Sequence, residues 1–304
     1  MRFGFYLGAI ALAAPAHAET FDMVGHFPAP YRDVSLARSF GIDRISGRDG
    51  AALAVAIEDR LAHDGPDGRP YYDLIALSRR GPDADAILSG TADATIRESD
   101  VKRKVDQCVE QDGDRCNRKE KVEATCLQET VSFSSTLRVA RGEDGRILYS
   151  QSRPQTETLT TCPGDKGKRT PRESIRRMVK TAADRFVADI VPRHERYKVR
   201  LREGREGMDK PTGEAFKASV KLSQRDPDAA CAQWGDMDGA QPGQPSLLFN
   251  LGLCAERTGA YGKAERFYAQ AGQALGRGDF NDDMKRVRDL TVGRDDAAAR
   301  MAGD

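Results

Sequence analysis

The six cysteines are the residues of this chain with the most definite chemistry. They stand at Cys108, Cys116, Cys126, Cys162, Cys231 and Cys254. An even number of cysteines in an exported protein favours disulfide bonds. The spacing favours the pairs 108–116, 126–162 and 231–254. A zinc site is disfavoured, because the chain has no C-x-x-C pair and no histidine near the cysteines. We therefore expect three disulfides and no metal site.

The pair 126–162 also follows from a predicted β-hairpin. Apolar and polar residues alternate from residue 127 to residue 139, which is typical of a strand with one buried face. A turn at 142–145 with Gly145 in the left-handed conformation of a G1 bulge places Val139 opposite Tyr149. In the same register Cys126 faces Cys162. Pro154 indicates an edge strand or a bulge, and a bulge would shift the register by one residue.

Other candidate chemistry is weak. The histidines that follow the N-terminal segment, at 26, 63 and 194, are far apart in the sequence, and no nucleophile, phosphate-loop or metalloprotease motif is present. Asp112-Gly113-Asp114 lacks the further ligands of a calcium loop, so a solvated turn is favoured. Gly47-x-x-Gly50 before a helix is better explained as an ordinary helix entry than as a phosphate site. We expect no catalytic residue, no cofactor and no enzymatic activity.

The first residues predict export. Arg2, an apolar run over 3–14 and Ala16-His17-Ala18 form the pattern of a signal peptide, with cleavage after Ala18. The run is shorter than the ~20 apolar residues that a membrane-spanning helix needs. No other segment is apolar enough to cross a bilayer. Residues 1–18 are therefore predicted to be a signal peptide, and the mature protein to be soluble and periplasmic, without a transmembrane span.

The overall charge excludes one class of partner. The 304-residue chain has a formal net charge of +1, which falls to 0 without Arg2. A neutral chain of this kind points to no nucleic-acid partner. Two basic stretches, 166–180 and 193–205, are explained by a solvated face or by an anionic surface partner.

Residues 19–195 are predicted to form an α/β domain. Leu53, Ile57 and Leu61 mark a helix over 51–63, between an early extended segment and strands at 71–77 and 86–97. Residues 100–107 suit either a strand or a helix. Thr170-Pro171-Arg172-Glu173 is a capping box that begins a helix ending before Pro192. This helix is long enough to cover one face of the sheet. Residues 196–212 are predicted to be a linker.

Residues 213–304 are helical in pattern, and part of them resembles a tetratricopeptide repeat. The positions that fit the repeat are Leu251, Gly252, Gly259, Tyr261, Ala264, Tyr268 and Ala271. The small residues would let two helices approach closely, and the tyrosines would fill the gap. Ala230 and Trp234 repeat the pattern 34 residues earlier. Two repeats bury little apolar surface, so we expect the helices to dock on the first domain or on a partner.

The α/β domain is similar to a second family. Ala84 to Gly90, and Gly145 to Leu148 after the hairpin turn, match strands of the curli-secretion channel subunit and related periplasmic activators of penicillin-binding proteins. The resemblance covers roughly 34–191 and implies an envelope protein. Members are commonly lipoproteins, whereas this chain lacks a lipid-acceptor cysteine. The Thr/Ser face of 128–136 is too polar for a membrane-spanning hairpin, so a soluble binding module is favoured over a pore.

The sequence therefore predicts an α+β protein: an α/β sandwich with a disulfide-stapled antiparallel hairpin, then a helical tetratricopeptide-like domain. Its expected function is protein–protein binding in the envelope, as an adaptor or scaffold. The candidate groove for a protein or peptide partner lies around Asn250, Tyr261 and Tyr268. The alternatives are an oligomeric outer-membrane secretion or assembly component, and a hydrolase whose site is formed by residues remote in sequence.

Overall fold

The computed structural model describes residues 19–63, 65, 68–77, 84–113, 115–165, 167–276 and 280–302. The predicted signal peptide lies outside these residues. The chain divides into two compact units. One, called the helical unit below, joins the described part of Met1–Gly25 to Glu195–Val292. The other, called the α/β unit, joins His26–His194 to the described part of Gly293–Asp304.

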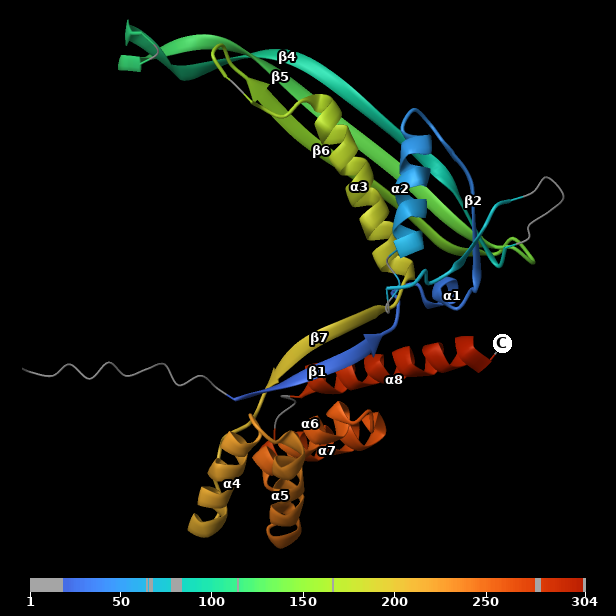
Figure 1. The fold of residues 1–304 in the computed structure, drawn as a ribbon, viewed down its shortest axis with the longest axis vertical. Coiled ribbons are helices and arrows are strands. Elements are labelled where there is room, and N and C mark those ends of the chain that lie inside the picture. Colours follow the sequence, from blue (N-terminus) through green and yellow to red (C-terminus); the bar gives the residue numbers. More distant parts are fainter. Residues whose placement is uncertain are drawn as a thin grey trace, which may run out of the picture. The chain divides into compact units, whose positions relative to one another are not determined.

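The α/β unit is built on a five-stranded mixed sheet in the order β3-β2-β4-β5-β6. Its strands are β2 Ser39–Ser46, β3 Asp73–Ile75, β4 Ala86–Asp112, β5 Arg115–Arg141 and β6 Ile147–Thr161. β2 runs parallel to β3 and β4, and β4, β5 and β6 are antiparallel. Helices α2 (Gly50–His63) and α3 (Pro171–Ile190) lie on one face of this sheet (Figure 1). The predicted α+β fold class is confirmed.

The two helices follow from local sequence. Leu53, Ile57 and Leu61 are at most 1% exposed and form the buried stripe of α2. Thr170 caps α3 through its side chain, and Glu173 completes the predicted capping box. The buried face of α3 meets a sheet face formed by residues that include Val131, Phe133, Leu137 and Val139. Residues 34 and 35 lie in the early segment that was expected to be extended, and they instead belong to the short helix α1 (Arg32–Ser35).

The hairpin register is confirmed. Val139 pairs with Tyr149 and Leu137 with Gln151. Gly145 has φ +72°, and the one irregularity of the β5–β6 ladder lies between Val139 and Ala140, as a bulge at the turn requires. Pro154 pairs with Ser134 without shifting the register, because β6 is an edge strand.

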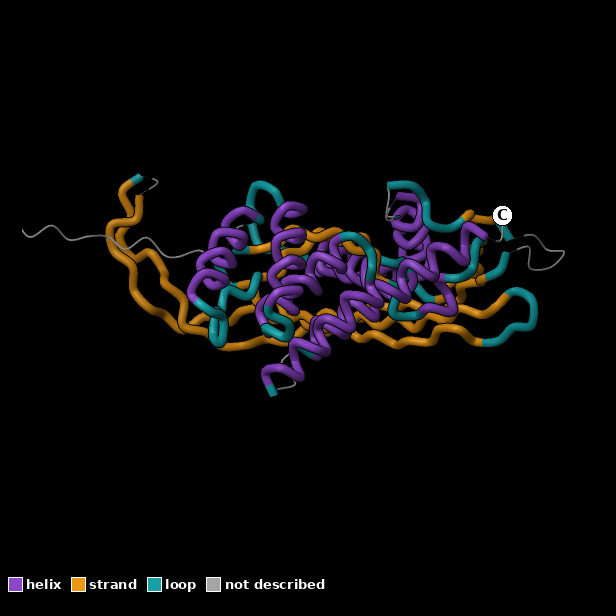
Figure 2. Tube along the Cα trace, turned by 90° about the horizontal axis from the view of Figure 1, so that it is seen from below, coloured by secondary structure: helices purple, strands orange, loops and turns teal. Residues whose placement is uncertain are grey.

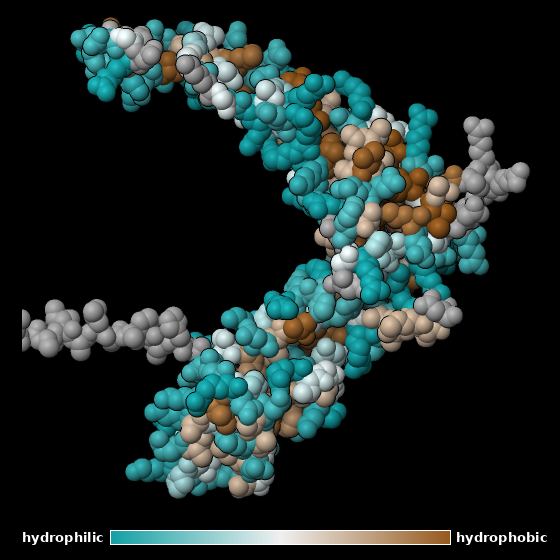
Figure 3. All heavy atoms as spheres, in the orientation of Figure 1, coloured by the Kyte–Doolittle hydropathy of each residue, from teal (hydrophilic) through white to brown (hydrophobic). Residues whose placement is uncertain are grey.

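The β4–β5 hairpin continues past the end of β6 as a two-stranded arm, which Figure 1 and Figure 2 show beyond the ends of the helices. Residues 100–107, which suited either structure, belong to strand β4. Hydrophilic side chains gather along the arm (Figure 3). Cys108–Cys116 closes its tip and Cys126–Cys162 fastens its base. These bonds stabilise a ribbon that is only marginally stable by itself.

All three predicted disulfides form, including Cys231–Cys254 between α5 and α6. Three disulfides in one chain are typical of proteins that fold in an oxidising compartment. None of the helices in the described part of the chain is long and apolar enough to cross a membrane.

Four complete helices and part of a fifth lie in the described part of the helical unit. They are α4 Lys210–Leu222, α5 Pro227–Ala240, α6 Pro245–Arg257, α7 Tyr261–Leu275 and, up to Val292, α8 Asn281–Ala302. The expected close approach at Gly252 is present, since a Cβ atom there would lie 2.5 Å from the Tyr268 ring. Ala264 and Ala271 are fully buried beside it.

The unit boundaries differ from the predicted ones, because strands complete the helical core. Residues 196–212, expected as a linker, include most of β7 (Arg193–Arg200), which pairs with β1 (Thr20–Phe27). Phe21, Met23 and Leu201 are buried in the helical core, and the Phe21 ring lies 5.8 Å from Trp234. A pair of helical hairpins buries too little apolar surface alone, and these strand residues supply the remainder.

The last turns of α8 also differ from the predicted division, since they pack in the α/β unit. Asp296 is buried and pairs with Arg32 at 2.6 Å. Arg300 donates to the carbonyl oxygens of Ser35 and Tyr71, and its guanidinium lies 4.2 Å from the Tyr71 ring centre. These contacts fix the loop that follows α1.

We expect the base disulfide to stabilise the protein more than the tip disulfide. The bonds span 36 and 8 residues respectively. Loop-closure entropy therefore predicts a loss of about 4 kcal/mol for Cys126→Ser/Cys162→Ser and about 2.5 kcal/mol for Cys108→Ser/Cys116→Ser. Urea unfolding followed by circular dichroism measures both. A larger loss for the tip pair would contradict the assigned role of the base bond.

Candidate functional site

The three residues predicted to line a partner groove lie in the helical unit, and two of them are fully buried. Asn250 and Tyr268 have no exposed surface, and Tyr261 is half-buried. The Asn250 side chain binds both the N–H and the carbonyl group of the Arg202 backbone. Its Oδ1 accepts from the Arg202 N–H at 2.9 Å, and its Nδ2 donates to the Arg202 carbonyl at 2.9 Å. Asn250 therefore binds a segment of its own chain.

The Arg202 side chain extends the same contact. Its guanidinium carbon lies 5.4 Å from the Phe249 ring centre and 4.7 Å from the Phe280 ring centre. Cation–π contacts of this kind fasten a cationic side chain to a desolvated aromatic surface. The segment after β7 thus lies against α6 through both its backbone and its side chain.

Tyr268 takes part in a buried polar network centred on Glu256. Glu256 is 3% exposed. It accepts from the hydroxyl groups of Tyr197 at 2.7 Å and Tyr268 at 2.6 Å. Arg286 donates to both of its carboxylate oxygens, at 2.7 and 2.9 Å. Asp283 pairs with the same arginine at 2.7 Å. The network joins β7, α6, α7 and α8, so its primary role is to hold the helical unit together.

The network sets the ionisation of its members. Burial, followed by the adjacent Glu256 carboxylate, raises the pKa of Tyr268 and that of Tyr197. Burial also raises the pKa of Asp283. Hydrogen bonds and charge pairing with Glu256 raise the pKa of Arg286 against the opposing effect of its burial. Removing one partner from such a buried, fully hydrogen-bonded ion pair costs much stability, but the network offers no free group for a ligand.

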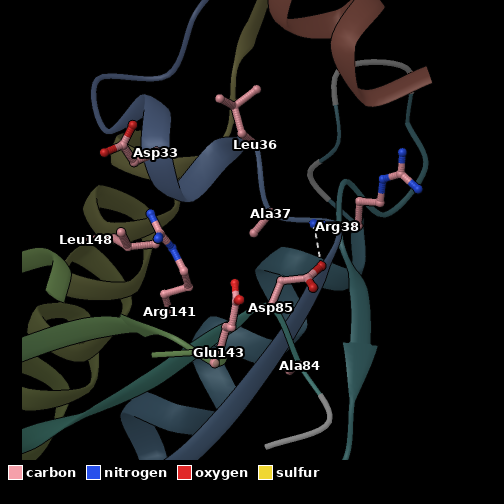
Figure 4. A pocket seen from close by; sticks show the side chains of 10 residues that line it. Asp33, Leu36, Ala37, Arg38, Ala84, Asp85, Arg141, Glu143 and Leu148 are labelled. Atoms are coloured by element: carbon pink, nitrogen blue, oxygen red, sulfur yellow. Dashed lines mark hydrogen bonds between the residues drawn. The ribbon is translucent and has the colours of Figure 1, made fainter. Parts of the chain in front are cut away.

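An open cleft of about 680 Å³ lies in the α/β unit (Figure 4). Its walls are the segment around α1, the start of β4, the β5–β6 turn and the first residues of β6. The residues that line it are Asp33, Leu36, Ala37, Arg38, Ala84, Asp85, Arg141, Gly142, Glu143 and Leu148. The cleft therefore lies at the end of the sheet where β4 and β6 begin and β5 ends, beside the segment around α1.

Backbone hydrogen bonds fix the geometry of the cleft. The Gly142 N–H donates to the Asp85 carbonyl at 2.8 Å. A Cβ atom on Gly142 would lie 1.9 Å from the carbonyl oxygen of Ala84, so only glycine allows this closure. The Asp85 carboxylate accepts from the N–H groups of Arg38 and Ser39 at 3.0 and 2.9 Å, and these backbone bonds lower the pKa of Asp85.

The cleft is lined by charged residues of both signs and by apolar residues. Arg141 reaches from the hairpin turn towards the side that carries Asp33, and Glu143 points into the space between Arg141 and Asp85 (Figure 4). Leu36 is 37% exposed. The described lining residues include no serine, cysteine or histidine, and the Asp85 carboxylate is engaged by backbone donors. This chemistry suits binding of a mixed polar and apolar surface.

The helical unit has a smaller hollow of about 360 Å³ between α5, α6 and α7. Leu251, Phe267 and the Cys231–Cys254 disulfide contribute its apolar lining. At its rim, Arg257 pairs with Asp228. This hollow and the α/β cleft are two separate surfaces of the protein.

Sequence reasoning did not identify the cleft residues. The glycines of the hairpin turn indicate its backbone geometry but not a site, although charged residues (Arg141 and Glu143) stand beside and within it. Asp33 lies within a four-residue helix that carries no periodic signal, and Arg38 follows that helix. The cleft could have been indicated by a charged hairpin turn that packs against the start of a strand, as Gly142 does against Asp85.

Comparisons with known proteins identify no family for this chain. No protein-family model matches it, and no curated protein matches it. A solved structure of a neuraminyllactose-binding hemagglutinin homolog from Helicobacter pylori is 12% identical and covers 50% of this chain and 80% of its own. The TM-score is 0.29, and a likeness at that level carries no argument about fold or function.

We expect Tyr268→Phe to destabilise the helical unit by about 1.5–3 kcal/mol, because it removes a buried hydrogen bond to a charged acceptor. The raised pKa also gives a pH dependence. In the unfolded chain Tyr268 ionises near 10.0, whereas in the fold it keeps its proton, so this contribution is full below pH 10 and declines above it.

The fluorescence of Trp234, the chain's one tryptophan and a buried residue of this unit, measures the unfolding. Tyr268→Phe should weaken the loss of stability above pH 10. An unchanged alkaline profile would show that Tyr268 is not protected by the Glu256 network.

Proposed function

We propose that this protein is an exported periplasmic adaptor that binds a protein partner through the cleft of its α/β unit. The observation that carries the proposal is the open cleft itself, whose lining combines the charged residues Asp33, Arg141 and Glu143 with the apolar residues Leu36 and Leu148. Protein–protein contact surfaces also combine charged and apolar residues. The charged residues would select and orient the partner.

Export is supported by the disulfides. All six cysteines are paired, and two of the bonds lie at the tip and at the base of the β4–β5 arm. Such bonds persist in an oxidising compartment such as the bacterial periplasm. Together with the N-terminal signal pattern, they favour a periplasmic location with cleavage after Ala18.

The two units support a scaffold role. In the proposed arrangement the α/β unit, which resembles the curli-channel and penicillin-binding-protein-activator family, holds one partner. The tetratricopeptide-like helices would offer a second surface at the hollow lined by Leu251 and Phe267. Asn250 and Tyr268 would act from behind this surface, since they fix the helices and their own β7 segment.

The proposal is tested by affinity capture from the envelope fraction with the disulfides intact. The mature wild-type protein should retain a specific envelope protein, and Arg141→Glu should reduce its recovery about tenfold, because a charge-assisted contact is replaced by repulsion. Arg146→Glu is the matched control, since it reverses a charge in the same hairpin turn outside the cleft lining.

Equal recovery of the partner by wild type and Arg141→Glu would contradict the assignment of the cleft. Recovery of the protein alone as a large ring would instead favour an oligomeric assembly component. Both variants should have the same urea midpoint of unfolding as the wild type. This result would exclude misfolding as the cause of a reduced recovery of the partner.

A further inference from the structure

The face of the β4–β5–β6 sheet opposite α2 and α3 carries a regular array of hydroxyl groups. Because side chains alternate along a strand, every second residue lies on this face. The strand register aligns these residues in six rows of three. The rows are Ser89–Arg138–Ser150, Thr91–Thr136–Ser152, Asp93–Ser134–Pro154, Thr95–Ser132–Thr156, Arg97–Thr130–Thr158 and Ser99–Gln128–Thr160. Thirteen of the 18 positions are serine or threonine. We call this surface the hydroxyl face.

The hydroxyl face is accessible. Its β4 residues from Thr91 to Ser99 and its β6 residues from Ser150 to Thr158 are exposed, and most of its β5 residues are half-buried between their neighbours. One hydroxyl pair, Thr136 and Ser152, is hydrogen-bonded across the strands at 3.2 Å. The array therefore presents donors and acceptors on three adjacent strands.

An ordinary solvated face does not explain this composition. Such faces carry long charged side chains, and the arm formed by the same two strands does so: 14 of its 26 residues from 100 to 125 are charged. On the hydroxyl face only Arg97, Arg138 and Asp93 are charged, although 31% of the whole chain is. Charge thus decreases sharply along β4 and β5 from the arm to the hydroxyl face.

The geometry points to an uncharged glycan chain as the ligand of the hydroxyl face. A hydroxyl group both donates and accepts, so an array of them matches a polymer whose own surface is made of hydroxyl and amide groups. A surface with three charges among 18 positions is complementary to a polymer without charge. This role is separate from the cleft and does not depend on the proposed protein partner.

The array also sets the size of the ligand. Rows separated by two residues along a strand lie about 6.8 Å apart, so six rows extend over about 34 Å. Each neutral hydrogen bond contributes little free energy by itself, and affinity comes from many bonds made together. Binding should therefore grow steeply with the length of the glycan, and a disaccharide should bind far more weakly than a polymer.

The test is retention of the full mature protein on insoluble chitin, cellulose and amylose, with polygalacturonate as a charged comparison. The protein should bind at least one uncharged polymer, and raised salt should leave this binding unchanged. Thr130→Val/Thr158→Val keeps the shape and strand preference of two side chains in one row while removing their hydroxyl groups. It should lower the affinity about tenfold.

Thr125→Val/Thr161→Val is the matched control, because it makes the same change on the same two strands at positions of the opposite face. This double variant should bind like wild type. Binding to none of the uncharged polymers, salt-sensitive binding to polygalacturonate alone, or equal loss in both double variants would each overturn the proposal.

Discussion

The register of β5 is the constraint on which the α/β unit depends. This strand pairs along its length with β4 and over more than half of it with β6. A shift of one residue would move Val131, Phe133 and Leu137 from the core to solvent and their serine and threonine neighbours into the core. The same register brings Cys126 opposite Cys162 and places the turn that closes on Asp85. Core, disulfide, cleft and hydroxyl face are thus consequences of one pairing.

The helical unit depends on a different kind of contact. Its helices are too few to enclose a core, and the segments that flank residues 26–194 in the sequence complete it: Phe21 and Met23 from β1, and Leu201 after β7. Asn250 and Glu256 then anchor this completed core with backbone and hydroxyl contacts to β7 and the residues after it. A polar residue on the inner side of a helical hairpin can therefore bind a strand of the same chain, although the sequence pattern suggests that it binds a partner.

Much of the fold could be predicted because its determinants are local. The capping box at Thr170, the turn at Gly145 and the alternating pattern up to Val139 each act within a few residues. The boundaries of the two units could not be predicted, because they depend on contacts between segments that are distant in sequence, such as Phe21 with Trp234 and Asp296 with Arg32. No periodic signal marks such pairs.

The candidate site was less accessible to sequence reasoning for the same reason. The cleft is assembled from segments that meet only in the fold, and its charged residues come from the segment around α1, the start of β4 and the β5–β6 turn. The hydroxyl face was visible as a polar strand around 128–136, but its extent follows only from the three-strand register. Patterns within one strand show which side is polar, and the pairing shows how large that side is.

The central claim, that the cleft receives a protein partner, is tested most directly by photo-cross-linking in the intact envelope. A photoreactive amino acid at Leu36, in the cleft, should cross-link to a specific envelope protein, which mass spectrometry identifies. The same group at Val55, which is 65% exposed on α2 outside the cleft, should not. Cross-linking at Leu36 that is absent, or identical to that at Val55, would contradict the account.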